Sequence, residues 1–250
     1  ICYTFGSSSG GENENSEESK TFAGVISIFD AQIVLFPIWS MFGPVWVTTE
    51  ELLKNYCFEV SDCLELENDS QVGITSGVQA KGNALNLGWL MLNIKDNLTI
   101  TPPDEWNKAE INNAIDKTVI VRESIFSHII NSNLEVRTSV SIDPKTGAAK
   151  EGGLFTYEAI PRATFLSFDV VLDDYRQLDT DGKKPFSVCK TFNKEQGKDN
   201  AGCSLDKTWN DSLDVMKSGL SLIEYLGIGG MGTRGFGRIK QVGNSIDSSV

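Results

Sequence analysis

The feature that most constrains the fold is a strict alternation of apolar and polar residues over 134–143. The apolar or β-branched positions are Leu134, Val136, Thr138, Val140 and Ile142, and the polar ones are Glu135, Arg137, Ser139, Ser141 and Asp143. Because successive side chains of a β-strand point to opposite faces, this pattern predicts a strand with one wet face. Residues 143–147 (DPKTG) are typical of a turn. With the extended run 154–160 behind it, the segment predicts a hairpin, although an ordinary surface hairpin has the same pattern.

Strands are also predicted near the start of the chain. Residues 22–36 are dense in β-branched and aromatic residues and predict a buried strand that Pro37 ends. Residues 44–48 predict a second short strand, and residues 164–172 a strand after the hairpin. Residues 59–83 are polar and acidic, with several glycines, and are interpreted as a loop or irregular insertion.

Helices are predicted between these strands. Thr48 stands three residues before Glu51, which is a capping-box pattern that opens a short helix. Further helices are expected over 102–115 and 122–131, and between Trp209 and Ile223 apolar residues recur at helical spacing, which indicates a core stripe. The mixture predicts an α+β fold, with helices on a mostly antiparallel sheet, in a single domain with insertions over 1–250.

Two polar segments are expected to lie outside the core. Residues 6–20 are rich in Gly, Ser and Glu and are interpreted as a flexible loop. Residues 176–206 carry several lysines and are interpreted as a polar, solvated insertion.

Near the end of the chain, residues 227–240 form a glycine-rich loop. Six of the eleven residues from 227 to 237 are glycine. Glycine lets backbone N–H groups approach a phosphate closely and allows the left-handed conformations that build an anion-binding nest. Arg234, Arg238 and Lys240 add three cations, and residues 225–246 contain no acid. Phe236 offers a ring for base stacking or a core anchor. The loop therefore predicts contact with phosphates.

Other glycine-rich motifs fit this segment less well. A dinucleotide-binding GxGxxG turn must follow a strand and open a helix, whereas a predicted helix precedes this loop and only 13 residues follow Gly237. A Walker loop requires GK[ST], which is absent. A disordered turn is the remaining alternative, against which the flanking arginines, Phe236 and Ile239 argue.

Charge is distributed unevenly along the chain. The formal net charge is −12, but residues 1–116 hold 17 acidic and 5 basic residues, whereas residues 117–250 hold 17 of each. Uniform acidity would argue against a nucleic-acid partner. Segregated acidity leaves room for a local basic groove.

Other classes of protein have little support. No apolar run reaches the roughly 18 uninterrupted residues of a bilayer-spanning helix, and the first residues lack the layout of a signal peptide. Five cysteines without a CxxC pair, and one histidine, give weak support to a zinc site. We therefore expect a cytoplasmic protein with no membrane and no metal site, while a disulfide between Cys189 and Cys203 stays open.

Three motifs together carry a family resemblance. Residues 229–239 (GGMGTRGFGRI) closely resemble the C-terminal glycine-rich signature of the RAMP superfamily, the repeat-associated proteins of CRISPR systems. Residues 137–165 resemble the thumb hairpin of backbone subunits in type III effectors, which sets the thumb-like segment at 134–165. Residues 30–48 look most like the repeating backbone subunit of the type III-B (Cmr) complex.

The resemblance implies a ferredoxin-like (RRM-like) core and a guide-RNA-binding backbone subunit of a type III CRISPR ribonucleoprotein that targets complementary RNA in antiviral defence. Its partners would be CRISPR guide RNA, complementary target RNA and other effector subunits, including copies of itself. No cofactor is expected in the chain, and a divalent metal is an option for target cleavage. The RNA-binding residues implied are Gly229, Gly230, Gly232, Thr233, Arg234, Gly235, Phe236, Gly237, Arg238 and Lys240 in the loop, and Arg137, Phe155, Tyr157 and Arg162 in the thumb.

The sequence departs from the family pattern at three places. Trp39 stands where family members often carry arginine, and Ala163 stands where glycine is usual before Thr164. The first strand and helix that normally precede an element such as 5–7 (FGS) are not found, so the domain is expected to be N-terminally incomplete. The resemblance places the target-cleaving aspartate in that part, and the catalytic residues are therefore unknown.

Two alternatives belong to other functional classes. A stand-alone RAMP endoribonuclease that processes CRISPR repeat RNA would use a histidine, or Tyr and Lys groups, for acid–base work. His128 is flanked by apolar residues, which favours a place in or beside the core. An acidic, secreted, β-rich binding module would require Cys189 and Cys203 to be oxidised to a disulfide.

Overall fold

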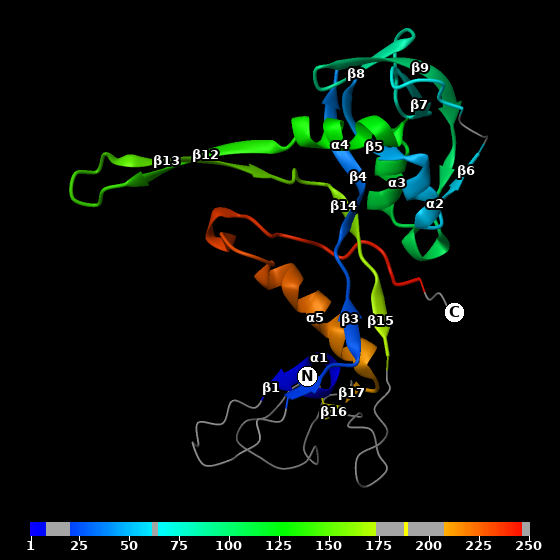
Figure 1. Ribbon diagram of the computed structural model, residues 1–250. Helices are drawn as coiled ribbons and strands as arrows, with labels where there is room; N and C mark the ends of the chain where they lie inside the picture. The colour runs from blue at the N-terminus through cyan, green and yellow to red at the C-terminus, as the bar shows by residue number, and fades with distance from the viewer. Residues whose placement is uncertain (9–20, 62–64, 174–187, 190–207, 247–250) are drawn as a thin grey trace, which may run out of the picture. The chain divides into compact units, whose positions relative to one another are not determined.

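The computed structural model of the chain describes residues 1–8, 21–61, 65–173, 188–189 and 208–246. Contacts divide these residues into two compact units (Figure 1). The first unit is formed from 1–30 and 168–241, and the second from 31–167 and the residues from Val242 on.

The second unit is built on a seven-stranded mixed sheet. Its strands, in spatial order, are β14 (Phe165–Ser167), β4 (Gln32–Ser40), β5 (Gly43–Thr49), β11 (Thr118–Val121), β7 (Gln71–Thr75), β9 (Leu90–Leu98) and β8 (Ala84–Leu87). The pairs β5–β11 and β7–β9 are parallel and the other four are antiparallel. Strands β6 (Glu59–Val60) and β10 (Ile100–Thr101) form a separate two-stranded antiparallel pair. The predicted α+β class is confirmed.

Pro37 lies inside β4, whereas the sequence pattern predicted that it ends the strand. Pro37 pairs with Trp46 in β5, and the N–H of Trp46 donates to Lys117 O on its other side. The Pro37–Trp46 pair is therefore one that exchanges no hydrogen bonds, so the missing proline N–H costs this ladder nothing. On the opposite side, the pairing of β14 with β4 stops at Leu35.

The segment predicted as an irregular loop over 59–83 contains a central strand, β7. Val72, Gly73, Ile74 and Thr75 of β7 are buried. The hydroxyl of Thr75 donates to Asp116 O at 2.7 Å and accepts from the N–H of Thr118 at 2.8 Å. A strand buried on both faces shows no polar–apolar alternation, which is why the period-two pattern does not mark it.

Helices α2 (Glu50–Asn55), α3 (Ala109–Ile115) and α4 (Glu123–Ser132), with the 3-10 turn η1 (Asp104–Trp106), complete the second unit. Thr49 caps α2, since its hydroxyl accepts the N–H of Leu52 at 3.2 Å. The cap is thus one residue later than the predicted Thr48, which is buried in β5. Two apolar clusters fill the unit, one around Phe36, Val47 and Ile129, the other around Leu35, Leu53 and Ile120.

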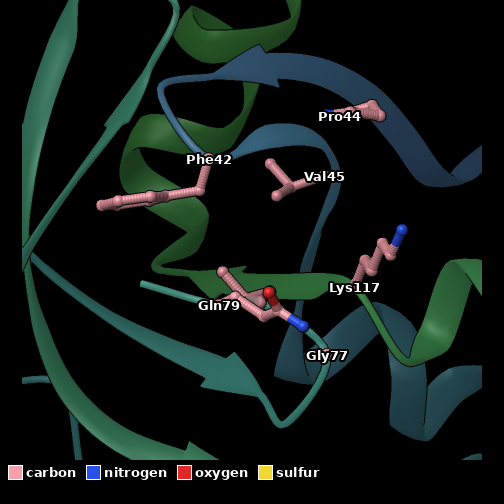
Figure 2. Close-up of a pocket in the computed structure, with 7 residues that line it drawn as sticks. Phe42, Pro44, Val45, Gly77, Gln79 and Lys117 are labelled. Atoms are coloured by element: carbon pink, nitrogen blue, oxygen red, sulfur yellow. The ribbon is translucent and has the colours of Figure 1, made fainter. Parts of the chain in front are cut away.

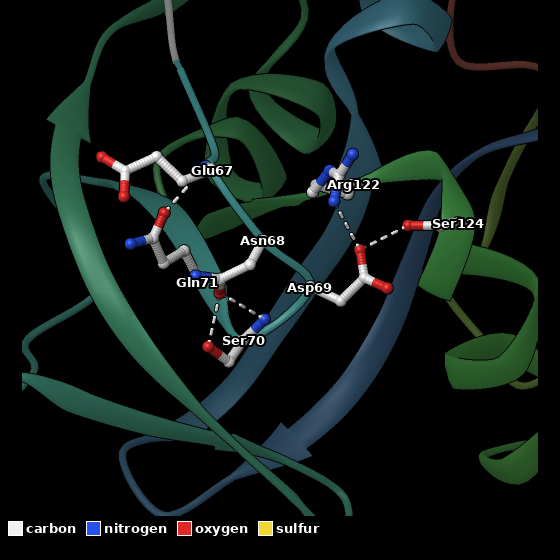
Figure 3. Close-up of polar contacts among 7 residues, drawn as sticks. All are labelled: Glu67, Asn68, Asp69, Ser70, Gln71, Arg122 and Ser124. Atoms are coloured by element: carbon white, nitrogen blue, oxygen red, sulfur yellow. Dashed lines mark hydrogen bonds and ion pairs between the residues drawn. The ribbon is translucent and has the colours of Figure 1, made fainter.

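A polar network joins the segment before β7 to the start of α4 (Figure 3). Asp69 Oδ1 accepts the Arg122 guanidinium at 2.9 Å and the Ser124 hydroxyl at 2.6 Å. Asn68 Oδ1 accepts the N–H of Ser70 at 3.0 Å, which is a local side-chain turn. These contacts fix the entry of β7 into the sheet and engage Arg122 within the fold.

The end of β4 approaches the β8–β9 turn at the other side of the large sheet. Asn86 of β8 accepts the N–H of Met41 on its Oδ1 at 2.6 Å, and the N–H of Gly88 donates to Trp39 O at 3.4 Å. Asn86 Nδ2 also donates to Gly88 O at 2.8 Å and so holds the β8–β9 turn. One side chain therefore bridges two segments that are 45 residues apart.

Over its described residues, the first unit contains three short strand pairs, a short helix, a long helix and a 3-10 turn. Its elements are α1 (Cys2–Phe5), β1 (Gly6–Ser8) with β2 (Thr21–Ala23), β3 (Ile26–Ile28) with β15 (Val170–Leu172), β16 (Val188–Cys189) with β17 (Thr208–Trp209), α5 (Ser212–Leu226) and the 3-10 turn η2 (Gly232–Arg234). Asp211 caps α5 by accepting the N–H of Asp214 at 2.7 Å. Val215 and Met216 are buried, so the predicted core stripe of α5 lies on its N-terminal half.

Several sequence predictions fall wholly or partly outside the described residues. Gly6–Ser8 is a strand rather than loop, and the rest of the predicted flexible loop, 9–20, lies outside. Most of the 176–206 insertion lies outside, as does Cys203 of the possible disulfide. The single-domain prediction stays a prediction. Of the helices described, α5 is the longest at 15 residues, shorter than a bilayer-spanning helix needs.

Candidate functional site

The predicted hairpin is present and projects from the second unit as a two-stranded arm (Figure 1). It consists of β12 (Glu135–Ile142) and β13 (Ala149–Ala159), paired antiparallel from Glu135–Ala159 to Val140–Leu154 with an irregularity before the Ile142–Ala149 pair. At about 3.3 Å per residue, an 11-residue strand is roughly 36 Å long. The hairpin is therefore long enough to reach a molecule well beyond its own unit.

The two faces of the hairpin differ in chemistry and in exposure. The aliphatic face carries Val136, Thr138 and Val140 opposite Glu158, Thr156 and Leu154. The aromatic face carries Glu135, Arg137 and Ser139 opposite Ala159, Tyr157 and Phe155. The alternating pattern predicted that the first set would be the covered one. The structure reverses this, because on β12 the aliphatic positions are exposed and the polar positions are half-buried.

The aromatic face brings together three residues of the predicted site. The rings of Phe155 and Tyr157 lie 6.0 Å apart between centroids and are tilted by 33°. The hydroxyl of Tyr157 lies 3.1 Å from that of Ser139, and Arg137 forms an ion pair with Glu135 at 2.8 Å. This face therefore offers two neighbouring rings beside a guanidinium whose position is set by a neighbouring carboxylate.

The base of the hairpin is held by a residue that the sequence did not single out. The indole N–H of Trp46 donates to Ala163 O at 2.9 Å, and Thr164 Oγ1 donates to Pro161 O at 2.8 Å. Ala163 has φ +65°, the left-handed conformation that glycine adopts without strain. The turn expected of the family is thus formed with alanine, at a cost in strain, and the exposed Arg162 lies within it.

In the first unit, the glycine-rich loop follows α5 directly and is closed at its two ends. The N–H of Ile228 donates to Gly237 O at 2.9 Å. A Cβ added at Gly237 would lie 1.8 Å from Ile228 O, and one added at Gly227 would lie 3.0 Å from Gly237 O. Both residues also have positive φ, of +68° and +77°. We call Gly227 and Gly237 the closing glycines, because a close backbone oxygen and a positive φ both oppose a side chain there.

Four other glycines lie between the closing glycines, and no atoms pack closely against them. A Cβ added at Gly229, Gly230, Gly232 or Gly235 meets no atom within 4 Å. Gly229 and Gly235 have positive φ, whereas Gly230 and Gly232 do not. We call these four the open glycines. They leave bare main chain on the outside of the loop, where a ligand can approach the backbone closely.

The backbone between the open glycines alternates in handedness. Met231 is left-handed at φ 58°, Gly232–Arg234 forms the 3-10 turn η2, and Gly235 is left-handed at φ 84°. Alternation of this kind occurs in anion-binding nests, but two N–H groups are used within this turn: that of Arg234 donates to Met231 O at 2.8 Å and that of Gly235 to Gly232 O at 3.0 Å. Thr233 and Arg234 are exposed on this turn. The phosphate contact of the loop stays a prediction.

The cations of the loop are not equivalent. Arg238 donates from Nη1 to Tyr225 O at 2.8 Å, one of the carbonyls left without a helical partner at the C-terminus of α5. Arg234 contacts the sulfur of Met231 at 3.8 Å and is exposed. Lys240 is exposed, and Phe236 is half-buried. Arg238 thus has a structural role in addition to its charge.

The described residues offer neither a cavity of the usual size for a small-molecule ligand nor a cluster of metal-binding side chains. A cavity of about 160 Å³ is lined by Phe42, Pro44, Val45, Gly77, Val78, Gln79 and Lys117 (Figure 2), which is below the 300–1,000 Å³ typical of small-molecule sites. Over residues 1–8, 21–61, 65–173, 188–189 and 208–246, no three His, Cys, Asp or Glu side chains are grouped to hold a metal ion. The described donor set does not fit a divalent metal.

Two carboxylates of the second unit have shifted pKa values. A hydrogen bond from Lys95 at 2.6 Å, and its charge, lower the pKa of Glu67. A hydrogen bond with Glu51, then burial and the charge of Glu51, raise the pKa of Glu123. Both groups are exposed, and neither lies beside the predicted RNA-binding residues.

The position of His128 corrects a prediction. The flanking apolar residues favoured a place in or beside the core, but His128 is exposed on α4. Its neighbour Ile129 takes the buried position instead. The 3.6-residue period determines which residues of a helix are buried. Apolar neighbours in sequence therefore do not bury the residue between them.

Comparison with known protein families identifies a family that covers almost the whole chain. The model of the RAMP superfamily matches residues 1–240 of this chain. A search of curated protein sequences returns no match.

Comparison with solved structures returns partial similarities in backbone trace. A chain of the type III-B Cmr-beta complex bound to cognate target RNA has 17% sequence identity and a TM-score of 0.46, covering 91% of this chain and 71% of that chain. The apo state of Cmr-beta gives 18% identity and a TM-score of 0.47 over the same shares. Oligomeric Cmr4 from Pyrococcus furiosus gives 19% identity and a TM-score of 0.40, covering 64% of this chain and 60% of that chain.

Proposed function

The chain belongs to the RAMP superfamily, and on that premise we propose that it is a guide-RNA-binding backbone subunit of a type III CRISPR ribonucleoprotein that targets complementary RNA. The observation that carries the proposal is the set of open glycines, at which an added Cβ meets nothing within 4 Å. Glycines that the fold does not need for packing, placed together on one exposed loop, are what a close-approaching polymer backbone requires.

The chemistry of the loop suits a phosphate backbone. Recognition by phosphate and shape uses main-chain N–H groups and arginines rather than side chains that read base edges. The left-handed Met231 and Gly235 flank a turn that carries Arg234. No acid stands anywhere in 225–246, although the chain as a whole is strongly acidic. The loop therefore carries positive charge in a chain that is acidic overall, which suits phosphate binding.

The hairpin supplies the second contact with RNA. Phe155 and Tyr157 present two neighbouring rings beside Arg137 on the aromatic face. Such rings take up the faces of unpaired bases, and stacking tolerates any base sequence. In this proposal the loop holds the guide backbone, and the hairpin enters between bases where guide and target RNA pair. The type III-B (Cmr) class rests on the motif resemblance at 30–48.

The proposal is tested by adding atoms to the loop. In the double variant Gly230→Ala, Gly232→Ala, neither residue has positive φ and neither added methyl group meets protein. We expect normal folding and guide-RNA affinity reduced by roughly tenfold, because a Cβ occupies the space that the phosphate backbone needs. The measurement is the dissociation constant for guide RNA over a series of salt concentrations.

The matched control is Gly219→Ala in α5. Its added Cβ also meets nothing within 4 Å, and it lies in the same unit. It should strengthen the helix by about 1 kcal/mol and leave RNA affinity unchanged. Unchanged RNA affinity in the double variant would show that the loop is not part of the RNA interface. An equal loss of RNA affinity in the Gly219→Ala control would lead to the same conclusion.

The exposure of His128 sustains a second candidate, a stand-alone RAMP endoribonuclease acting on CRISPR repeat RNA. An exposed imidazole is accessible to RNA, and histidine is the side chain most often used for acid–base catalysis. Incubation of the isolated protein with repeat RNA decides between the two. Cleavage that is abolished by His128→Ala would establish the second candidate, whereas no cleavage with retained binding favours the first.

A further inference from the structure

The residues that follow the glycine-rich loop are held by their backbone on the second unit. The indole N–H of Trp106, in η1, donates to Asn244 O at 2.8 Å, and the N–H of Asn244 donates to Glu105 O at 3.1 Å. Both main-chain groups of Asn244 are therefore engaged by one short turn. We call Glu105 and Trp106, together with the residues 242–244 that they hold, the tail clasp.

The tail clasp is closely packed. Val242 packs against the apolar cluster that contains Leu53. A Cβ added at Gly243 would lie 2.5 Å from Trp106 Cδ1 and 2.9 Å from its Nε1. Gly243 does not have a positive φ, so its backbone conformation does not require glycine. The missing side chain at this position is therefore explained by the close approach of the indole.

The indole of Trp106 is itself fixed by its surroundings. Its ring centroid lies 5.5 Å from that of Phe58, in an edge-to-face arrangement, and 6.0 Å from that of Tyr56. On its backbone, Trp106 O accepts the N–H of Lys108 at 2.7 Å. These contacts hold the indole in one orientation, with its N–H directed at the tail.

The downstream end of the glycine-rich loop is tied to α5. Arg238 donates from Nη1 to Tyr225 O at 2.8 Å, and the N–H of Gln241 donates to Glu224 Oε1 at 2.6 Å. By its contacts, the chain passes from the first unit to the second between Gln241 and Val242. The last contact with α5 and the first with the second unit are thus made by consecutive residues, and no spare length of chain lies between them.

The chain also passes between the units at two other places, which are paired with each other. One lies at 30–31, between β3 and β4, and the other at 167–168, between β14 and β15. Strand β3 pairs with β15, and β4 pairs with β14. Two strands alone make a narrow connection, because an isolated two-stranded ribbon has only marginal stability. The tail clasp adds a third attachment, made by other residues.

We propose that Trp106 is a positioning residue for RNA binding. Through the tail clasp it links the downstream end of the glycine-rich loop to the second unit, so that the loop and the hairpin bind one RNA molecule jointly. The inference rests on the proposed function, which assigns the guide backbone to the loop and bases to the hairpin. When two contacts are linked, the second forms at a high effective concentration once the first has formed. An RNA that uses both contacts therefore gains affinity from the clasp.

The test uses two variants of the full chain that release the tail from opposite sides. Trp106→Phe keeps an aromatic ring and removes the N–H that donates to Asn244 O. Gly243→Ala keeps the indole and places a methyl group against it. The matched control is Trp209→Phe, which removes an indole donor to Ser218 Oγ at 2.8 Å within the first unit.

Hydrogen exchange measures the release of the tail. The N–H of Asn244 should exchange at least tenfold faster in both clasp variants, because its hydrogen bond to Glu105 O is weakened. In the control it should exchange as in the unaltered chain. The N–H of Ile228, which donates to Gly237 O inside the loop, should keep its protection in all variants. Unchanged protection of Asn244 in both clasp variants would overturn the clasp itself.

Guide-RNA affinity then measures the positioning role. We expect the dissociation constant to rise by roughly tenfold in each clasp variant and to stay unchanged in the control. The same substitutions are also made in a chain with Phe155→Ala and Tyr157→Ala, which removes both rings of the hairpin. In that background the clasp variants should cause no further loss, because only one contact with RNA is left to position.

Two results would overturn the proposal. One is an unchanged guide-RNA affinity in clasp variants whose tail is released. The other is an equal loss of affinity with and without the hairpin rings, which would mean that the clasp acts on the loop alone. An unaltered chain that does not bind guide RNA would instead refute the proposed function.

Discussion

The glycine-rich loop and the hairpin differ in which atoms they offer to a ligand. The loop offers main chain, since its open glycines carry no side chains and a Cβ added at any of them meets nothing within 4 Å. The hairpin offers side chains, with Phe155 and Tyr157 on one face and aliphatic residues on the other. Main chain suits a repetitive phosphate backbone, whereas rings suit the faces of bases.

This difference determines how each region fails. A loop that works by exposing main chain is damaged by adding an atom. A hairpin that works through its side chains is damaged by removing atoms. The loop also contains two classes of glycine that look alike in sequence, because the closing glycines serve the fold and the open glycines face outward.

The largest effect is expected at a closing glycine. Gly237→Ala would place a Cβ 1.8 Å from Ile228 O at φ +68°. We expect a loss of about 3 kcal/mol in the free energy of unfolding, because both the clash and the backbone conformation oppose the change. Chemical denaturation measures it. The control is Gly230→Ala, which should be neutral within about 0.5 kcal/mol, and equal stability of the two variants would refute the division into two classes.

On the hairpin, Phe155→Ala should weaken RNA binding without affecting folding. Base–aromatic stacking is worth about 1–3 kcal/mol, so affinity should fall by roughly tenfold or more. Fluorescence anisotropy with a single-stranded RNA measures this loss. Leu154→Ala changes the neighbouring residue on the opposite face and serves as the control, because its RNA affinity should not change. A stronger effect from Leu154→Ala would show that the two faces have been assigned the wrong way round.

A smaller effect is expected at the base of the hairpin. Ala163→Gly should stabilise the chain by about 0.5–1 kcal/mol, since φ +65° strains alanine and suits glycine. The melting temperature reports the gain. Loss of stability would mean that the Cβ of Ala163 contributes more through packing than it costs in strain.

The smallest effect separates the two arginines of the loop. Arg238→Ala removes the donor to Tyr225 O and should cost about 0.5 kcal/mol of stability, because it leaves a carbonyl at the end of α5 without this cation. Arg234→Ala should leave stability unchanged. Each variant should also reduce the slope of log affinity against log salt by about one. An unaltered slope for Arg234→Ala would mean that this residue does not touch phosphate.

Local sequence patterns predicted many elements of the fold because they are set by neighbouring residues. The alternation at 134–143 predicted β12, and the spacing after Trp209 predicted α5. The same alternation did not predict which face of the hairpin would be exposed. Burial depends on whether a second layer covers the strand, which a period-two pattern cannot express.

Elements fixed by distant contacts were missed. Strand β7 pairs with β11 and β9, and its buried Gly73 and neutral neighbours lack an alternating pattern. The sequence pattern predicts a strand end at Pro37, but the direction of the Trp46 N–H makes its position in β4 acceptable. Both outcomes depend on residues distant in sequence, since Ile74 of β7 pairs with Val119 and the N–H of Trp46 donates to Lys117 O.

The candidate site was predictable in part. Composition and motif resemblance identified the loop and the hairpin, and their predicted residues are exposed or half-buried. The separation of closing from open glycines needs coordinates, because it depends on the position of Ile228 O relative to each glycine. The role of Trp46 at the hairpin base also became visible only in three dimensions, since Ala163 is 117 residues away.

The bridge made by Asn86 has a consequence for how sheets of different molecules meet. Strand β8 is the last strand of the seven-stranded sheet, and such an edge normally exposes unpaired N–H and C=O groups to which another chain can add a strand. Here the end of β4 turns back and satisfies groups around the β8–β9 turn. The chain thereby covers the turn end of this edge with its own backbone. Addition of a foreign strand is hindered at that end.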